Sequence, residues 1–339
     1  MQLSNEISSP VKAALLSKSN LSELIKQRAR ELGFDKVGLA SAQEFTDEAG
    51  HLREWLNRGY QADMRWLERD VEKRTDPRLL LPNARSAVVV ALNYFTPAQH
   101  EDNPATGKVS RYAWGDDYHD VVGERLRLLL AWIKEQLPDV EGKVCVDIQP
   151  TMDKAWAVRA GLGWLGKHSN VITQEFGSWI FIGELLLNID LDYDNDRIDD
   201  HCGTCTLCLD ACPTQAITEP YVVDSVKCIS YATIELREPE LPGEIADKLS
   251  GWFYGCDICQ DVCPWNRFEE PTNEVRFAPR NGNVNASLSE IVEMSHERYV
   301  ERFRGSAMKR AKLSGLQRNA RALIGPQASP PAVVADKAR

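Results

Sequence analysis

The 339-residue sequence contains no long hydrophobic run, and no apolar segment approaches the roughly 20 residues that a membrane-spanning helix needs. Its opening stretch, MQLSNEISSPVKAALLSKSN, has neither a compact apolar core after a basic start nor a twin arginine, so it does not resemble an export signal. We therefore expect a cytoplasmic protein with no membrane partner. An excess of positive charge is also lacking: 40 Lys and Arg stand against 50 Asp and Glu, a net charge of −10. This balance argues against nucleic-acid binding over the whole surface.

Cysteine is concentrated rather than abundant, since eight of the nine cysteines lie between residues 202 and 263. Cys202, Cys205, Cys208 and Cys212 are separated by two, two and three residues, and Pro213 follows the last of them. This is the bacterial iron–sulfur spacing, in which three thiolates hold one [4Fe–4S] cluster and the fourth reaches another. The run therefore predicts two clusters that share ligands.

A second run has the same ending but a displaced first ligand. Cys256, Cys259 and Cys263 precede Pro264, and Cys228 is the cysteine left to complete this set. The crossed pattern predicts one cluster on Cys202, Cys205, Cys208 and Cys263, and the other on Cys212, Cys228, Cys256 and Cys259. Two four-cysteine zinc sites are the alternative, but these usually come as two separated CxxC pairs. A disulfide framework does not suit a chain of this size without a secretory signal.

The remaining pattern predicts an α/β unit before the cysteines and short helices after them. We expect strands at 35–40, 86–95, 143–149 and 178–187, helices at 21–33, 47–58, 120–137 and 152–160, a loop at 96–110, short helices within 288–324 and a disordered tail at 325–339. Asp117 or Asp120 is the candidate cap of the third helix. The predicted domains are 1–193, 194–270 and 271–339. The acidic stretch at 190–200, with six Asp and one Arg, is the expected linker into the cysteine module.

The glycine-rich segment GLGWLGK imitates two nucleotide-binding loops. Gly161 to Lys167 fits both GxGxxG and GxxxxGK, but a helix-like segment precedes it, and His168 stands where a P-loop needs Ser or Thr. We therefore do not expect nucleotide binding. Glycines that let a large planar or anionic ligand approach the backbone, beside the charge of Lys167, remain the interpretation.

Asp147 is the candidate catalytic group. It lies at the end of the predicted strand KVCVDIQ, where Asp is unusual, so it needs either a partner or a task. It either caps the following helix or pairs with an arginine, or it is a proton donor whose pKa a closed apolar pocket raises. Cys145, on the same strand, is most simply a small buried hydrophobe. His119, in a near miss of the cobalamin motif DxHxxG, is more simply a polar residue at a helix start.

Residues 298–321 form a basic segment, with eight Lys or Arg against the single acid Glu301. It is either a solvated pair of basic helices or a surface that contacts phosphates.

Taken together, these segments resemble epoxyqueuosine reductases over nearly the whole chain. The resemblance is carried by EKRTDPRLLLPNARS, YAWGDDYHD, the strand with Asp147, AGLGWLGKHS, the paired CxxCxxCxxxCP runs and GSAMKRAKLSGLQRNA. Where many members read VDTGP, this chain reads VDIQP. The resemblance implies an α+β multidomain fold, with an α/β cobalamin-binding domain, a ferredoxin-like domain for two [4Fe–4S] clusters and a short C-terminal HEAT-like segment.

The resemblance also implies an activity and its partners. Epoxyqueuosine at the wobble position of tRNA is reduced to queuosine, the last step of queuosine biosynthesis. Cob(I)alamin, supplied with electrons by the clusters, carries the chemistry, and Asp147 donates a proton. An external donor such as a flavodoxin or ferredoxin supplies the electrons, and we expect a monomer. By motif position, the cobalamin contacts are Arg74, Ser110, Arg111, Asp147, His168, Val171, Ser230 and Tyr231, with Asp117 and Lys167 as further candidates. His119 is not expected to be an axial ligand.

The tRNA contacts expected in the basic segment are Lys309, Arg310, Lys312 and Arg318. Two other functions remain open. One is a cobalamin-dependent reductive dehalogenase, which shares the cofactors but usually carries a twin-arginine signal. The other is a ferredoxin-type electron carrier, for which the long segment before the first cluster cysteine has no evident use.

Overall fold

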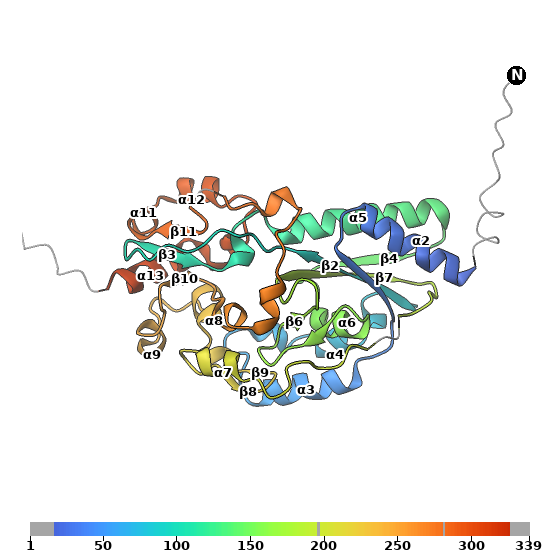
Figure 1. Ribbon diagram of the computed structural model, residues 1–339, viewed down its shortest axis with the longest axis horizontal. Helices are drawn as coiled ribbons and strands as arrows, with labels where there is room; N and C mark the ends of the chain where they lie inside the picture. The colour runs from blue at the N-terminus through green and yellow to red at the C-terminus, as the bar shows by residue number, and fades with distance from the viewer. Residues whose placement is uncertain (1–16, 195–196, 281, 326–339) are drawn as a thin grey trace, which may run out of the picture.

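The computed structural model describes residues 17–194, 197–280 and 282–325. The opening stretch before residue 17 and all but the first residue of the tail that we predicted to be disordered lie outside these residues. The elements run through the chain from α2 to α13 (Figure 1).

The α-helices are α2 (Lys18–Glu31), α3 (Thr46–Asn57), α4 (Val71–Thr75), α5 (Tyr118–Gln136), α6 (Asp153–Arg159), α7 (Leu207–Ala211), α8 (Ile229–Ile234), α9 (Gly243–Ala246), α10 (Ile258–Asp261), α11 (Leu288–Val292), α12 (His296–Arg302) and α13 (Lys312–Ile324). The 3-10 helices are η1 (Arg65–Leu67), η2 (Pro77–Leu79), η3 (Arg111–Ala113), η4 (Ser225–Lys227), η5 (Pro264–Phe268), η6 (Val275–Phe277) and η7 (Ala307–Ala311). The strands are β1 (Lys36–Ser41), β2 (Ser86–Asn93), β3 (Thr106–Val109), β4 (Gly142–Cys145), β5 (Trp164–Leu165), β6 (Val171–Ile172), β7 (Ile180–Leu187), β8 (Ile217–Glu219), β9 (Val222–Val223), β10 (Trp252–Tyr254) and β11 (Asn285–Ser287).

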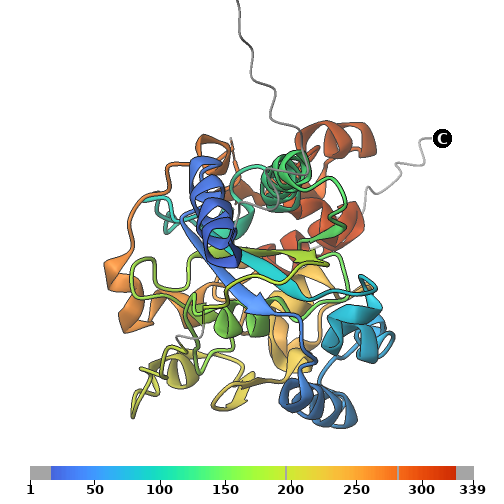
Figure 2. The same ribbon diagram turned by 90° about the vertical axis from the view of Figure 1, so that its right-hand side faces the viewer.

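A four-stranded sheet of order β1-β2-β7-β4 is the centre of the fold, and every pair in it is antiparallel. All eight residues of β2 are buried, as its continuous apolar sequence predicts. Helices α2 and α5 lie over one face of the sheet, while α3, α4 and α6 lie on the other side (Figures 1 and 2). The sheet is therefore covered on both faces.

Alternate residues of β2 supply the two cores. Val88 and Val90 pack with Leu126 of α5 on one face, whereas Val89 packs with Trp156 of α6 on the other. Side chains in a strand point alternately to the two faces, which explains why an antiparallel strand here is apolar throughout.

A second, three-stranded sheet joins segments that are far apart in sequence. Its order is β10-β3-β11, in which β3 pairs parallel with β10 and antiparallel with β11. The prediction that 96–110 is entirely loop was therefore wrong at β3. Each of the three predicted segments of the chain contributes one strand to this sheet.

The C-terminal helices form the short helical segment that the sequence predicts. Phe253 of β10 shares a core with Leu288, Phe303 and Leu316 of this segment. Figure 1 shows α11, α12 and α13 gathered around β3, β10 and β11, at the end of the molecule opposite α2.

Two local predictions need correction. The strand predicted at 143–149 ends at Cys145, so Asp147 lies in a loop and not in a strand. Of the two candidate caps of α5, Asp117 is the N-cap, and its carboxylate accepts from the His119 N–H. Asp120 instead lies in the first turn of that helix.

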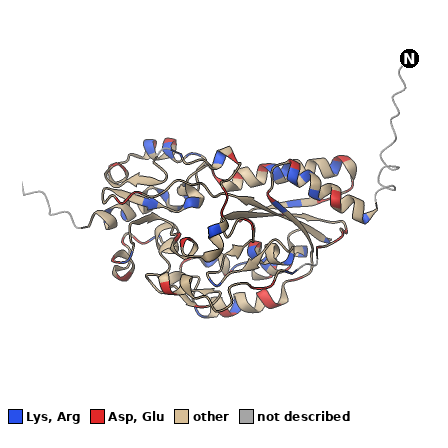
Figure 3. Cartoon of the chain, in the orientation of Figure 1, with Lys and Arg blue, Asp and Glu red and all other residues tan. Residues whose placement is uncertain are grey.

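Acidic and basic positions are mixed along α2 and α5, so these helices present no face of one charge sign (Figure 3). Within the described ranges, no helix is both long enough and apolar enough to cross a membrane.

Candidate active site and cysteine groups

Asp147 occupies the loop between β4 and α6, in a conformation that few non-glycine residues adopt. Its φ is 54°, in the left-handed region, and its side chain is 58% exposed. The side chain of Gln149 closes the loop, because its Oε1 accepts from the Val146 N–H at 2.9 Å. A left-handed backbone conformation at a non-glycine residue persists only where the surrounding structure stabilises it, and such residues are common at active sites.

Three consecutive side chains at the start of α5, those of Asp117, Tyr118 and His119, are linked to the Asp147 carboxylate by polar contacts. The Tyr118 hydroxyl donates to Asp147 Oδ2, and His119 Nε2 lies 3.4 Å from the same oxygen. On its other side, His119 Nδ1 lies 2.6 Å from Asp117 Oδ1. Asp117, His119 and Asp147 therefore form a carboxylate–imidazole–carboxylate array, which we call the acid–imidazole array.

The array places the proton on the imidazole. Burial lowers the pKa of His119, but the hydrogen bonds with Asp117 and Asp147 outweigh it and raise the pKa to about 9. Burial raises the pKa of Asp147, but the hydrogen bonds from His119 and Tyr118 outweigh it, and the pKa lies below its usual range. The closed pocket expected to raise the pKa of Asp147 is thus not present in this conformation.

A second pair of acids lies beside Asp147. Glu184 of β7 is completely buried, and neither of its carboxylate oxygens accepts a hydrogen bond from the described residues. It faces the Asp153 carboxyl at the start of α6, so the pair is stable only when one of the two carries a proton. Burial first, and Asp153 next, raise the pKa of Glu184 well above its usual value. Burial and the charge of Asp147 raise the pKa of Asp153 to about 6.

Sequence reasoning missed Tyr118, Asp153 and Glu184. The available signal was Glu184, a lone acid within the apolar strand sequence IFIGELLL.

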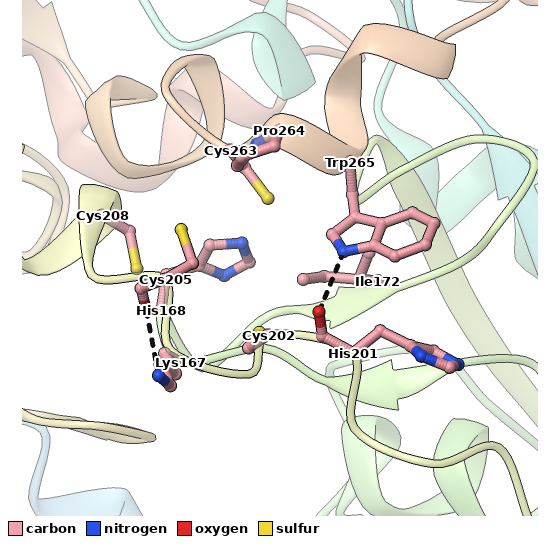
Figure 4. A pocket seen from close by; sticks show the side chains of 10 residues that line it. All are labelled: Lys167, His168, Ile172, His201, Cys202, Cys205, Cys208, Cys263, Pro264 and Trp265. Carbon is pink, nitrogen blue, oxygen red and sulfur yellow. Dashed lines mark hydrogen bonds between the residues drawn. The ribbon is translucent and has the colours of Figure 1, made fainter.

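Four cysteine sulfurs surround one cavity. Cys202, Cys205, Cys208 and Cys263 line a space of about 140 Å³, and Figure 4 shows their sulfur atoms directed toward it. They are the four cysteines that the crossed spacing assigns to one cluster, and we call them the first cysteine group. None of the four takes part in a disulfide.

The other four cysteines, Cys212, Cys228, Cys256 and Cys259, form the second cysteine group and likewise take part in no disulfide. Burial raises the pKa of Cys259, and the charges of Cys228, Asp257, Cys208 and Cys212 raise it further. Burial also raises the pKa of Cys256, and Cys259 and Cys228 add to this effect. In the part of the chain that the structure describes, no three His, Cys, Asp or Glu side chains converge on a single metal ion.

Lys154 of α6 connects the second cysteine group to the acids. Burial lowers the pKa of Lys154, and the charges of Asp147, Cys259 and Cys228 oppose this effect. Its ammonium donates to Ser169 O at 2.6 Å. Lys154 therefore lies within electrostatic reach of both Asp147 and the second cysteine group.

Some of the residues predicted to contact cobalamin lie near these acids. Arg74 donates to Trp66 O at 3.2 Å, and its buried Nε has no partner among the described residues. Burial lowers the pKa of Arg74, opposed by Asp153, Asp70 and Asp147. An orphaned guanidinium N–H beside Asp147 suits an additional polar ligand.

Tyr231, in α8, donates to Asp63 Oδ2 at 2.9 Å. Ser230 precedes it in the same helix and is partly exposed. Val171 is buried in β6.

Ser110 and Arg111 do not face the acids. Both are buried, and both donate to the Asp257 carboxylate, next to Cys256. The Arg111 guanidinium lies over the Trp114 ring, 4.4 Å from its centroid. These contacts anchor the segment that carries the second cysteine group, and the contact of both residues with cobalamin stays a prediction.

Lys167 and His168 line the cavity of the first cysteine group. The Lys167 ammonium donates to Gly203 O at 2.6 Å and to Cys205 O at 2.9 Å. His168 is 4% exposed and lines the same cavity as the four sulfurs (Figure 4). Burial lowers the pKa of His168 to about 4, so its imidazole is neutral.

The basic segment divides into exposed and buried members. Lys309, Arg310 and Lys312 are exposed around η7, and Arg310 pairs with Glu235 at 2.8 Å. Arg318 is 6% exposed and donates to the carbonyls of Ala232, Leu236 and Glu238. Unlike the three exposed members, Arg318 has its guanidinium buried by α13 against the end of α8, which does not favour the predicted tRNA contact.

A cluster of acids together with two groups of four cysteines that form no disulfides indicates the class of an iron–sulfur oxidoreductase. A family model described as 4Fe-4S double cluster binding domain matches residues 201–266, and another, described as Epoxyqueuosine reductase QueG, DUF1730, matches residues 74–148.

Curated relatives extend this similarity over the chain. An epoxyqueuosine reductase from Synechocystis sp. is 50% identical over 289 residues, which cover 84% of this chain and 99% of the relative. One from Cellulophaga algicola is 46% identical over 303 residues, covering 89% and 98%. The chain therefore belongs to the epoxyqueuosine reductase family, and it is an oxidoreductase.

Solved structures give the same result. A crystal structure of an epoxyqueuosine reductase with an epoxyqueuosine-modified tRNA-Tyr stem loop is 34% identical, with a TM-score of 0.85, and the match covers 91% of this chain and 82% of that one. A Bacillus subtilis epoxyqueuosine reductase, whose aspartate catalytic loop is swung out of the active site, is 32% identical with a TM-score of 0.85 and the same coverages.

Proposed function

We propose that this chain reduces epoxyqueuosine in tRNA to queuosine. Family membership supports the reaction, and a relative of the same fold has been crystallised with an epoxyqueuosine-modified tRNA stem loop. The observation that carries the proposal is the position of Asp147. Its carboxylate contacts two side chains that carry protons, those of Tyr118 and His119. It also shares a nearby cation, Lys154, with the second cysteine group.

Removal of the epoxide oxygen as water consumes two electrons and two protons. The acid–imidazole array is suited to supply one of these protons to the departing oxygen. In the open loop the proton is on His119, because the pKa of His119 is about 9 and that of Asp147 is low. When the loop closes over the substrate, desolvation of Asp147 raises its pKa, and the proton moves from Nε2 to Oδ2. Asp147 then acts as the donor, and His119 replenishes it.

The loop that carries Asp147 is built to move between these states. Ile148, directly after it, is 74% exposed, and Asp147 itself has a strained φ. The Bacillus subtilis relative, in which an aspartate catalytic loop is swung out of the active site, supports the same interpretation here.

We also propose cobalamin as the cofactor, as the family resemblance implies. Cobalamin supplies a metal centre able to deliver two electrons to carbon, which a one-electron cluster does not provide. Arg74, Ser230 and Tyr231 are the proposed contacts, and the unpartnered Nε of Arg74 fits a polar side chain of the corrin ring. The second cysteine group, which shares Lys154 with Asp147, would hold the cluster that lies nearer to the cobalamin.

The tRNA backbone is proposed to lie over η7, beside the acids. The charge of Lys309 lowers the pKa of Asp117, and the charge of Asp147 raises the pKa of Arg310. Each cation therefore lies near one of the two carboxylates and partly balances its negative charge. Exposed Lys and Arg beside a reaction site position phosphates without reading sequence. An external one-electron donor such as a flavodoxin or ferredoxin, a monomeric state and a cytoplasmic location complete the proposal.

The role of Asp147 is tested with Asp147→Asn, assayed for conversion of epoxyqueuosine in tRNA. Asn keeps the shape of the side chain but cannot carry the proton, so we expect turnover to fall by about 100-fold or more, with iron and cobalamin content unchanged. Asp139→Asn, an exposed change in the loop before β4, is the matched control and should turn over like the wild type. Wild-type turnover by an Asp147→Asn protein loaded with both cofactors would exclude Asp147 as the donor.

A further inference from the structure

The β5–β6 hairpin brings two nitrogen-bound protons to the first cysteine group. Trp164 begins the hairpin and His168 lies in its turn, which Gly166 and Asn170 close with a backbone hydrogen bond of 2.8 Å. Both side chains are buried, at 2% and 4% exposure. The proposed epoxyqueuosine reaction assigns neither of them a role.

The tautomer of His168 follows from its contacts. The backbone N–H of Asn170 donates to His168 Nδ1 at 3.2 Å, so Nδ1 carries no proton. A neutral imidazole that accepts at one nitrogen is a donor at the other, which is Nε2. That atom is buried and has no partner within the described ranges, although the ring lines the cavity of the four sulfurs (Figure 4).

Trp164 repeats this pattern from the other end of the hairpin. Its ring meets those of His201 and Trp265 edge-on, with centroids 5.0 and 4.8 Å apart, and both of these residues line the cavity. The indole nitrogen is buried and makes no hydrogen bond of normal geometry with the described residues. It lies close enough to Cys202 that its N–H lowers the pKa of that thiol, which burial raises.

Two orphaned donors at one cavity are costly unless the cavity contains an acceptor. An unsatisfied buried N–H destabilises a protein by roughly 1–3 kcal/mol. The sulfurs of a cluster held by Cys202, Cys205, Cys208 and Cys263 are such acceptors. His168 lines the cavity itself, and Trp164 packs against His201 and Trp265, which also line it. Lys167, the other nearby cation, is already engaged with two carbonyls, and the His201 ring points away from the sulfurs (Figure 4).

We propose that Trp164 and His168 donate hydrogen bonds to the cluster of the first cysteine group and thereby set its reduction potential. Hydrogen bonds to the sulfurs are among the features that fix the potential of such a cluster. Donors favour the reduced cluster, which carries more negative charge, so they raise the potential. The hairpin is thus a tuning element for the cluster that is farther from Asp147.

The test is a redox titration of the cluster-loaded, cobalamin-free protein, followed by electron paramagnetic resonance. His168→Leu and Trp164→Phe each remove one N–H, and one of the two reduction waves should move to a more negative potential while the other stays. His168→Gln retains a donor and should leave the wave closer to that of the wild type than Leu does. Trp132→Phe, on α5 away from the cysteines, is the matched control for loss of an indole.

A measurement on the wild type covers the case in which a variant loses its cluster. Protein labelled with ¹⁵N in His and Trp is reduced, and pulsed electron paramagnetic resonance is used to detect nuclear couplings to the cluster. We expect couplings from one imidazole and one indole nitrogen. The absence of both couplings, or unchanged waves in both His168→Leu and Trp164→Phe at full iron content, would overturn the proposal.

Discussion

His119 should titrate far above an ordinary histidine, and this prediction examines the acid–imidazole array directly. Its pKa is raised from 6.5 to about 9, which corresponds to about 3 kcal/mol of preferential binding of the charged form. The side chain is 24% exposed, so solvent screening reduces this value somewhat. Because the folded pKa is the higher one, the stabilisation is fully present below pH 6.5 and is lost as the pH rises through about 9.

The two carboxylates should contribute unequally. Asp117 lies 2.6 Å from the imidazole and Asp147 lies 3.4 Å from it, so Asp117→Asn should lower the pKa of His119 more than Asp147→Asn does. Asn is as good an N-cap as Asp, so the start of α5 is preserved.

The assay is a proton NMR titration of the histidine ring signals in the cluster-loaded, oxidised protein. The sequence has six histidines, and the spectrum of His119→Gln identifies the relevant signal. A wild-type His119 that titrates near 6.5, or a larger fall in Asp147→Asn than in Asp117→Asn, would refute the array as described.

Three further predictions concern the surface, the helical segment and the clusters. Lys309→Ala with Lys312→Ala should weaken tRNA binding and lower the slope of log affinity against log salt by roughly 1.5–2, measured by binding at several salt concentrations. Arg318→Ala should lower the free energy of unfolding by about 3 kcal/mol, measured by denaturant titration, because three carbonyls lose their buried donor. Cys263→Ala should reduce bound iron from about eight atoms to about four per chain, measured by iron analysis, because one cluster loses a ligand.

Each of these has a control in the same chain. Lys134→Ala, near the far end of α5, should leave the salt slope unchanged, and Arg321→Ala, exposed on α13, should leave stability near the wild type. Cys145→Ala should retain all the iron, since Cys145 is a buried thiol of β4 that packs in a hydrophobic core. Equal effects in a variant and its control would remove the corresponding residue from its assigned role.

The features that the sequence predicted well are those with local patterns. The spacing of Cys202, Cys205 and Cys208 is a local signal, and the crossed assignment of Cys263 agrees with its place in the same cavity. The apolar run of β2 and the cap at Asp117 likewise depend on near neighbours in sequence.

The features that it did not predict depend on distant partners. β3 is a strand only because β10 and β11 pair with it from the other end of the chain. Arg318 looks like a surface cation until α8 is packed against it. His119 and Asp147 are 28 residues apart, so their pairing follows from the packing of α5 beside β7 and β4.

The proposed function depends above all on the conversion of epoxyqueuosine to queuosine in tRNA. The purified protein is reconstituted with iron, sulfide and cobalamin, reduced without oxygen, and incubated with epoxyqueuosine-containing tRNA, whose nucleosides are then analysed by mass spectrometry. We expect loss of one oxygen from the modified nucleoside and formation of queuosine by the wild type, with little or none by Asp147→Asn. Intact epoxyqueuosine after incubation with fully loaded, reduced wild-type protein would contradict the proposed function.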